Sequence, residues 1–299
     1  MFTPFGEDDR LDAAGLAAEA LFLRESGVSG IVVGGSMGEG AGLSEAELAE
    51  AVGLVIEAVD GEIPVLAAVI ADSSAEAVRL AKAARDAGAV GLQVPPPHFR
   101  LTAETRILAD YYRAITDGST LPLIIYNVMP TAEAAVESLE QLMIDNPAIV
   151  GVKQSARNMH TLAALLATLR GKVKLFSAID DMIYPSLVLG VDGTISGTSA
   201  IFPRETVELW KAVKAGDYER GLSLHERLTP VWRAVDLPDF SARAKYAAMM
   251  AGRPVGKPRG PFQWPTGEAA RNIEAALRAG GLLNGGLPSA VGSEQGAQA

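Results

Sequence analysis

Short apolar runs alternate with amphipathic stretches along the first two thirds of the chain. Each run has the length of a strand and is rich in valine, isoleucine or leucine. Both faces of each run are apolar, which is typical of parallel strands that lie under helices. The pattern predicts seven strands, at 30–35, 63–70, 89–94, 121–127, 148–154, 173–179 and 192–197.

The stretches between these runs have helical periodicity and recognisable ends. Ser44 is followed three residues later by Glu47, which is the spacing of a capping box at a helix N-terminus. Gly88 follows another amphipathic stretch, at the position where a glycine ends many helices. Further helices are predicted at 12–26, 102–116, 132–144, 157–169, 181–189 and 203–215.

Strands that alternate with helices through short loops indicate an α/β fold with a parallel sheet. Open doubly wound sheets usually have fewer than seven strands. One more strand–helix unit would complete a (β/α)₈ TIM barrel, which is the fold we predict. The remaining strand would precede Thr3-Pro4-Phe5, where little chain is left, so we expect it to be short or truncated. We assign the barrel to 1–216, a C-terminal helical appendage to 217–283 and a disordered tail to 284–299.

Composition narrows the class of protein. The chain has 299 residues, 48% of them hydrophobic, and a net charge of −10, so nucleic acid and anionic membranes are not expected as main partners. The absence of cysteine excludes thiolate chemistry and disulfides and fits a cytoplasmic protein. Neither a secretory signal nor an apolar run long enough for a membrane span is present. We therefore expect a cytoplasmic protein that acts on a small molecule.

Lys153 is the first candidate for chemistry. It lies near the end of the run 148–154, and it shares a face with Ile149 and Gly151 because strand side chains alternate, so we expect Gly151 to leave room beside it. If that face points inward, the lysine lies at the carboxyl end of a barrel strand, where barrel active sites lie. Burial disfavours the charged form of an amine, and the neutral amine can attack a carbonyl. The alternative is a strand-end lysine that extends to solvent.

Tyr126 occupies the corresponding position at the end of the run 121–127. A phenol there can carry protons between an amine adduct and a leaving group. A core tyrosine with a hydrogen-bonded hydroxyl is the alternative.

The glycine-rich loop 34–40 directly follows a predicted strand. Such loops can turn backbone N–H groups inward to hold a carboxylate, and Ser36 adds a hydroxyl, although a turn without a ligand is equally compatible. The loop also satisfies the GxSxG pattern of serine hydrolases. However, Gly40 and Gly42 separate Ser36 from the helix cap at Ser44, whereas that pattern needs a helix at once. A serine hydrolase is kept as an alternative only.

No motif for a metal or a dinucleotide is present. His98, His160 and His225 are scattered along the chain, and the loop 34–40 lacks the GxGxxG fingerprint. Asp180-Asp181 lies at a predicted helix start, where aspartates cap the helix. We therefore predict neither a metal nor a cofactor.

Together these residues resemble the dihydrodipicolinate synthase / N-acetylneuraminate lyase family of Schiff-base aldolases. The C-terminal Lys245 and Arg259-Gly260-Pro261 also resemble that family. The resemblance implies a TIM barrel that forms homotetramers. The matching pieces, in the family's order, are Thr3-Pro4-Phe5, 35–39, Tyr126-Asn127, 151–155, Asp180-Asp181 and 193–196.

The resemblance implies three catalytic residues. Lys153 would form an imine with a 2-oxo acid, Tyr126 would carry protons, and the Ser36 hydroxyl would relay to the tyrosine. The protonated imine is an electron sink that stabilises the carbanion formed in cleavage, condensation or elimination. The residues implied for holding the substrate are Gly35, Met37, Gly193 and Ile195.

Three departures from the family matter. Met37 stands where the family usually has a threonine. In the segment 95–100, His98 falls near the position of a tyrosine that reaches a neighbouring subunit's site, so an imidazole relay is possible there. The synthases also carry an arginine shortly after the Tyr126-Asn127 motif, and this chain has none. Because the arginine fork is hard to replace, aspartate semialdehyde is not the expected substrate.

The leading prediction is a Schiff-base lyase, aldolase or dehydratase acting on a small 2-oxo acid, pyruvate or a 2-keto-3-deoxy sugar acid. One alternative is a dihydrodipicolinate synthase that condenses pyruvate with an aldehyde. Another is a deaminase or hydratase-aldolase on a cyclic or aromatic keto acid. From a different class, a barrel that binds a keto acid without turnover is also kept.

Overall fold

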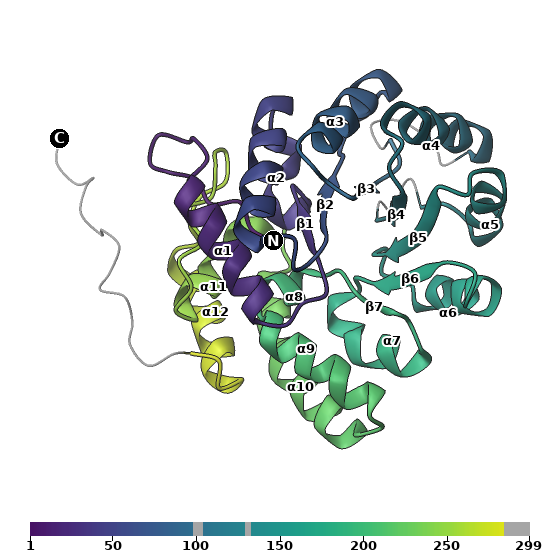
Figure 1. The fold of residues 1–299 in the computed structure, drawn as a ribbon. Helices are drawn as coiled ribbons and strands as arrows, with labels where there is room; N and C mark the ends of the chain where they lie inside the picture. The colour runs from purple at the N-terminus through teal and green to yellow at the C-terminus, as the bar shows by residue number, and fades with distance from the viewer. Residues whose placement is uncertain (98–103, 129–132, 284–299) are drawn as a thin grey trace.

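A single parallel sheet forms the centre of the molecule in this computed structural model, which describes residues 1–97, 104–128 and 133–283. Each strand pairs with the next in chain order, so the sheet curls around a central axis (Figure 1). All seven predicted strands are confirmed. They are β1 (Ile31–Val33), β2 (Val65–Ala68), β3 (Gly91–Val94), β4 (Leu123–Asn127), β5 (Ile149–Gln154), β6 (Lys174–Ser177) and β7 (Gly193–Thr194).

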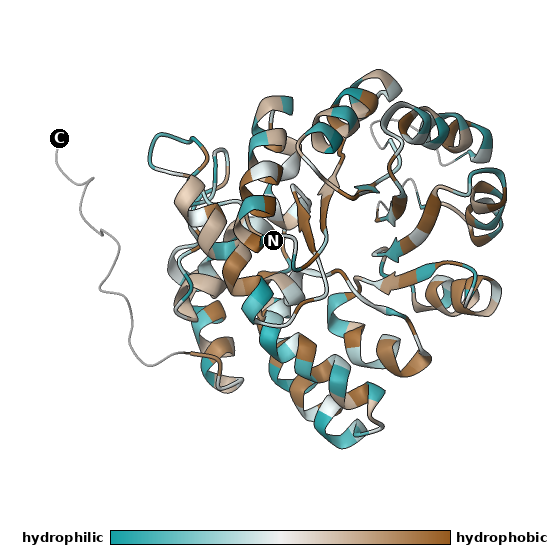
Figure 2. Cartoon of the chain, viewed as in Figure 1, coloured by the Kyte–Doolittle hydropathy of each residue, from teal (hydrophilic) through white to brown (hydrophobic). Residues whose placement is uncertain are grey.

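Helices lie around the outside of this sheet (Figure 1). Hydrophobic colour follows the strands, while hydrophilic colour is found mainly on the outward surfaces of the helices (Figure 2). This is the arrangement expected where both faces of each strand are covered. The surrounding helices are α1 (Ala13–Glu25), α2 (Glu45–Val59), α3 (Ser74–Asp86), α4 (Thr105–Ser119), α5 (Val136–Asp145), α6 (Met159–Leu169), α7 (Ile183–Leu189) and α9 (Pro203–Lys214).

The predicted helix ends are confirmed where a local hydrogen bond sets them. At the start of α2, Glu47 N donates to Ser44 Oγ at 3.3 Å, and Ser44 N donates to Glu47 Oε2 at 2.9 Å. A cap of this kind contributes about 1 kcal/mol. After α3, Gly88 has a φ of +100°, the left-handed conformation that glycine adopts without strain.

The N-terminal segment runs beside β1 without extending the sheet. The Met1 amine donates to Val32 O at 3.1 Å, and Phe5 forms isolated bridges to Leu11 and Lys257. Pro4 has no N–H to donate, so a strand cannot continue regularly through this segment. The predicted N-terminal strand is therefore not among the strands of the sheet in the described residues.

The C-terminal part is helical, as predicted, and packs on the barrel. It consists of α10 (Tyr218–Val235), α11 (Phe240–Met250) and α12 (Gly267–Ala279). Because α10 packs directly on α9, the boundary proposed at residue 216 stays a prediction. The tail 284–299 lies outside the described residues. Within the described part of the chain, no helix is long and apolar enough to cross a membrane.

Four short helices interrupt the loops at the carboxyl end of the sheet. Their sequences are too short to show helical periodicity, and the sequence analysis missed them. They are α8 (Gly197–Ile201) and the 3₁₀ turns η1 (Ser36–Gly38), η2 (Gly40–Gly42) and η3 (Asp180–Met182).

Candidate active site

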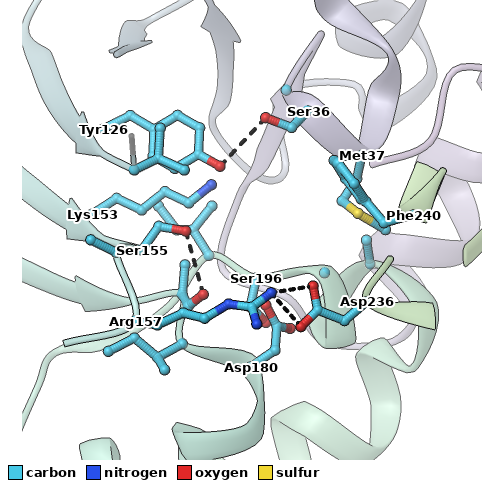
Figure 3. A pocket seen from close by; sticks show the side chains of 18 of the residues that line it. Ser36, Met37, Tyr126, Lys153, Ser155, Arg157, Asp180, Ser196, Asp236 and Phe240 are labelled. Atoms are coloured by element: carbon cyan, nitrogen blue, oxygen red, sulfur yellow. Dashed lines mark hydrogen bonds and ion pairs between the residues drawn. The ribbon is translucent and has the colours of Figure 1, made fainter. Parts of the chain in front are cut away.

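A pocket of about 630 Å³ opens where the strands end and the loops begin. Its walls come from loop 34–40, from the ends of β4 and β5, and from α10 and α11 (Figure 3). Ser36, Tyr126 and Lys153 all line it. The carboxyl end of the strands is where barrel enzymes place their sites.

Lys153 and Tyr126 are brought together by strand pairing. They are register partners in the parallel ladder of β4 and β5, and both side chains are buried. The Lys153 amine lies 3.6 Å from the centre of the Tyr126 ring, and the Tyr126 hydroxyl lies 3.4 Å from Ser36 Oγ. An amine, a phenol and an alcohol therefore form a continuous series from three separate elements (Figure 3).

Gly151 shares the inward face with Lys153, but its role differs from the sequence interpretation. A Cβ at this position would lie 2.8 Å from the carbonyl oxygen of Lys174 in β6. The glycine therefore permits close approach of the β6 backbone, rather than leaving room beside the amine.

A buried polar network fixes the ends of β4 and β5. Asn127 Nδ2 donates to Gln154 Oε1 at 2.9 Å, which joins the residues that directly follow Tyr126 and Lys153. Asn127 Oδ1 accepts from Ala134 N at 2.9 Å, and Gln154 Nε2 donates to Glu133 Oε1 at 3.0 Å. The sequence shows Asn127 and Gln154 only as members of motifs, because their hydrogen-bond partners come from other segments of the chain. Buried amides that are fully paired hold the neighbouring side chains in one position.

Loop 34–40 folds back on itself tightly. Gly34 has a φ of +70°, and a Cβ on Gly40 would lie 1.5 Å from Gly34 O, so a larger residue does not fit there. Within the described residues, the backbone N–H groups of Ser36 and Met37 donate to no partner. They border the pocket beside Gly35 and can hold the carboxylate of a substrate.

A buried ion pair anchors this loop, and the sequence analysis assigned it no role. Glu39 Oε1 lies 2.7 Å from the Lys245 amine, and both side chains are buried. Lys245 also donates to the carbonyl oxygens of Thr3 and Lys257, each at 2.7 Å. Burial lowers the pKa of Lys245, while the Glu39 carboxylate acts in the opposite direction. The loop is thus tied to both the N-terminal and the C-terminal segments.

Asp180 is buried at the edge of the pocket. It accepts a hydrogen bond from Thr198 N at 2.5 Å, at the start of α8. The interpretation of Asp180 as a cap of its own helix is therefore wrong, since its partner belongs to a helix that the sequence pattern did not show. Burial raises the pKa of Asp180 to about 6, against the opposing effect of the α8 amides.

The other predicted site residues are placed as follows. Met37 and Ile195 line the pocket, and the backbone N–H of Ile195 donates to Ser177 O at 3.2 Å. Gly193 does not line it; this residue borders a second cavity of about 420 Å³ between β1 and β7. His98 lies outside the described residues.

The outer half of the pocket combines an apolar wall with an ion pair. Trp232, Phe240 and Met37 line one side. A Cβ on Gly197 would lie 2.3 Å from the Trp232 ring, so the glycine lets the indole lie against the backbone. Arg157 pairs with Asp236 at the pocket edge (Figure 3). Sequence reasoning gave no signal for Trp232, Asp236 and Phe240, because they lie far along the chain from Lys153 and reach the pocket only through tertiary packing.

The geometry does not favour hydrolase or metal chemistry. Among the described residues that line the pocket there is no histidine to activate Ser36. The α-helix that follows Ser36 begins only at Glu45, after two short 3₁₀ turns, so the nucleophile elbow is absent. No group of three histidine, aspartate or glutamate side chains in the described ranges is arranged to hold a metal ion.

Comparison with protein families gives one match along almost the whole chain. The model of the Dihydrodipicolinate synthetase family matches residues 1–280.

Curated relatives of similar length carry one name. A 4-hydroxy-tetrahydrodipicolinate synthase of Methanospirillum hungatei JF-1 is 30% identical over 282 residues, covering 93% of this chain and 95% of the relative. A protein of the same name from Rhizobium meliloti is 30% identical over 285 residues, covering 95% and 97%.

Solved structures agree with the fold. Dihydrodipicolinate synthase from Aquifex aeolicus superposes with a TM-score of 0.88 at 26% identity, covering 96% of this chain and 98% of that chain. A prophage protein of the dihydrodipicolinic acid synthase family from E. coli K12, solved in complex with pyruvate, gives 0.87 at 27% identity, covering 94% and 96%. The predicted (β/α)₈ fold class with C-terminal helices is confirmed.

Proposed function

Because this chain belongs to the dihydrodipicolinate synthetase family, whose members are Schiff-base lyases and synthases, we propose that Lys153 forms an imine with pyruvate and that the resulting enamine adds to an aldehyde. The observation that carries the proposal is the position of the Lys153 amine. It is buried at the end of β5, 3.6 Å from the Tyr126 ring, in the pocket at the carboxyl end of the sheet.

Imine formation begins with binding of the keto acid. The unpaired N–H groups of Ser36 and Met37 are suited to hold its carboxylate, which presents the ketone carbon to Lys153. The neutral amine attacks this carbon and forms a carbinolamine. The Tyr126 hydroxyl donates a proton to the departing oxygen, which leaves as water, and the nitrogen lone pair completes the C=N bond.

Carbon–carbon bond formation follows from the charge on the imine. The positively charged nitrogen accepts electrons when the Tyr126 phenolate left by the previous step takes a proton from the methyl carbon, so an enamine forms. The enamine carbon attacks the aldehyde, and the new alkoxide takes up the proton from the Tyr126 hydroxyl. Water then hydrolyses the imine and restores the free amine. Ser36 Oγ is 3.4 Å from the Tyr126 hydroxyl and can pass protons between the phenol and the open part of the pocket.

The direction of the reaction is the finer part of the proposal. The sequence favoured a lyase or dehydratase and kept condensation as an alternative, mainly because no arginine follows Tyr126-Asn127. The names of the curated relatives favour condensation, which is the reaction we adopt. Cleavage of a 2-keto-3-deoxy sugar acid uses the same imine in reverse and is the second candidate. Ser155 and Ser196, whose hydroxyl groups can bind a hydroxylated chain, line the pocket.

Reductive trapping tests the imine. We expect pyruvate and sodium borohydride to leave a stable adduct on Lys153, mapped by peptide mass spectrometry, because the reduced imine cannot hydrolyse. Lys153→Ala should give no adduct, whereas Lys172→Ala, a change at an exposed lysine outside the pocket, should retain it. Absence of an adduct with pyruvate and with longer 2-oxo acids would contradict the proposal.

A further inference from the structure

We propose that Arg157 binds a carboxylate of the second substrate at the mouth of the pocket. The inference rests on the condensation proposed above and assigns the aldehyde a chemical class. It begins from an arginine that the family motifs do not include and that lies four residues after the imine-forming lysine.

The Arg157 side chain is fixed at one edge and free at the other. Its Nη2 donates to both carboxylate oxygens of Asp236, at 2.7 and 2.6 Å. Asp236 is the C-cap of α10, so the ion pair links the loop after β5 to the C-terminal helices (Figure 3). Nε and Nη1 of Arg157 make no hydrogen bond or ion pair with another described residue, and the side chain is 76% exposed. A guanidinium with one edge anchored and the other edge unused is preorganised for a planar anion.

Two carboxylates of the pocket are already engaged. Glu133 accepts from Gln154, and Asp180 accepts from Thr198 N. In the proposed reaction the Lys153 nitrogen is bonded to the keto acid as an imine. Among the described side chains that line the pocket, Arg157 is therefore the cation available to a second anion.

The apolar wall of the pocket indicates what lies between the aldehyde and its carboxylate. Met37, Trp232 and Phe240 line the same pocket as Arg157 and offer hydrocarbon surface. A short apolar carbon chain fits such a wall better than a hydroxylated chain, because hydroxyl groups there would lose their hydrogen bonds to water. The second substrate inferred is an aldehyde with a short apolar chain that ends in a carboxylate.

Steady-state kinetics with matched aldehydes test the assignment. With pyruvate as donor, kcat/KM is measured for succinic semialdehyde and for pentanal, which has similar length but no carboxylate. We expect the enzyme to prefer succinic semialdehyde. Arg157→Leu should lower its kcat/KM by about 10- to 100-fold and change that of pentanal by less than about 2-fold, because a charge-assisted pair is lost. Arg157→Lys should be intermediate, since charge remains but the fork is lost.

Two controls separate this inference from the proposed function. Arg79→Leu removes an exposed, ion-paired arginine on α3 outside the pocket and should leave kcat/KM for both aldehydes unchanged.

Exchange of the methyl protons of pyruvate with D₂O, followed by NMR, reports imine and enamine formation without any aldehyde. The assignment is supported if Arg157→Leu still exchanges the methyl protons of pyruvate but loses kcat/KM for succinic semialdehyde selectively. Intact exchange with no preference for succinic semialdehyde, or with equal losses for both aldehydes, overturns it. Absent exchange in the unsubstituted enzyme contradicts the proposed function instead.

Discussion

Tyr126 lies between the two other residues proposed for catalysis, Lys153 and Ser36. Its ring contacts the Lys153 amine, and its hydroxyl approaches Ser36 Oγ, so one side chain joins the amine to the outer pocket. The sequence predicted the positions of all three residues, because side-chain alternation and strand ends are local properties. It could not predict that Tyr126 and Lys153 are register partners, since register is set by packing between strands.

Tyr126→Phe isolates the hydroxyl from the ring. Phenylalanine keeps the contact with the amine and the packing of the buried ring, so the thermal midpoint should change little. We expect kcat for condensation to fall by about 100-fold or more, because proton transfer to the departing oxygen loses its donor. Tyr184→Phe, a matched change outside the pocket, should retain kcat. Equal effects of the two substitutions would show that the Tyr126 hydroxyl has no part in proton transfer.

At the scale of elements, the loop between β1 and α2 was predicted in part. The glycines and the capping box were visible, because turn residues and caps are encoded within a few positions. The anchor of the loop was not visible, since Glu39 and Lys245 are far apart in the chain. An ion pair between distant segments leaves no periodic signal in the sequence. The helix α8 is also too short to show helical periodicity.

Lys245→Met tests the anchor. The substitution leaves the Glu39 carboxylate buried without its cation, which costs about 3 to 5 kcal/mol of unfolding free energy. We expect urea unfolding to show this loss and KM for pyruvate to rise, because Ser36 and Met37 lie in the anchored loop. The double variant Glu39→Gln with Lys245→Met should recover much of the stability, since no unpaired charge remains. A single variant as stable as the unsubstituted protein would argue that the pair does not hold the loop.

At the scale of the whole molecule, the sequence predicted the barrel from alternation alone, because each strand–helix unit repeats one local pattern. It did not predict how the appendage completes the pocket, since Trp232, Asp236 and Phe240 come from helices whose placement depends on tertiary packing. The homotetramer implied by the resemblance stays a prediction, as does the relay by His98.

The pH dependence of folding should carry a contribution from Asp180. Its pKa is raised to about 6 in the folded protein from an ordinary value of 3.8, so the folded state binds the proton more tightly. The stabilisation is complete below pH 4 and is lost as pH rises through 6, by at most about 3 kcal/mol. As pH rises over this range, we expect the unfolding free energy of the unsubstituted protein to fall relative to that of Asp180→Asn. Urea unfolding of both proteins at fixed protein concentration measures this change. Asp181→Asn is the neighbouring control, and a difference that is constant with pH would contradict the assignment.

The attachment of Lys245 has a consequence for how this protein can change over evolutionary time. The residues proposed for catalysis all lie in the first two thirds of the chain, yet the loop that carries Ser36 is held by a side chain of α11. A barrel and its appendage joined in this way do not diverge independently. We therefore expect substitutions in the C-terminal helices to be selected through the reaction itself, and a change at Glu39 to require a compensating change at Lys245, some two hundred positions away.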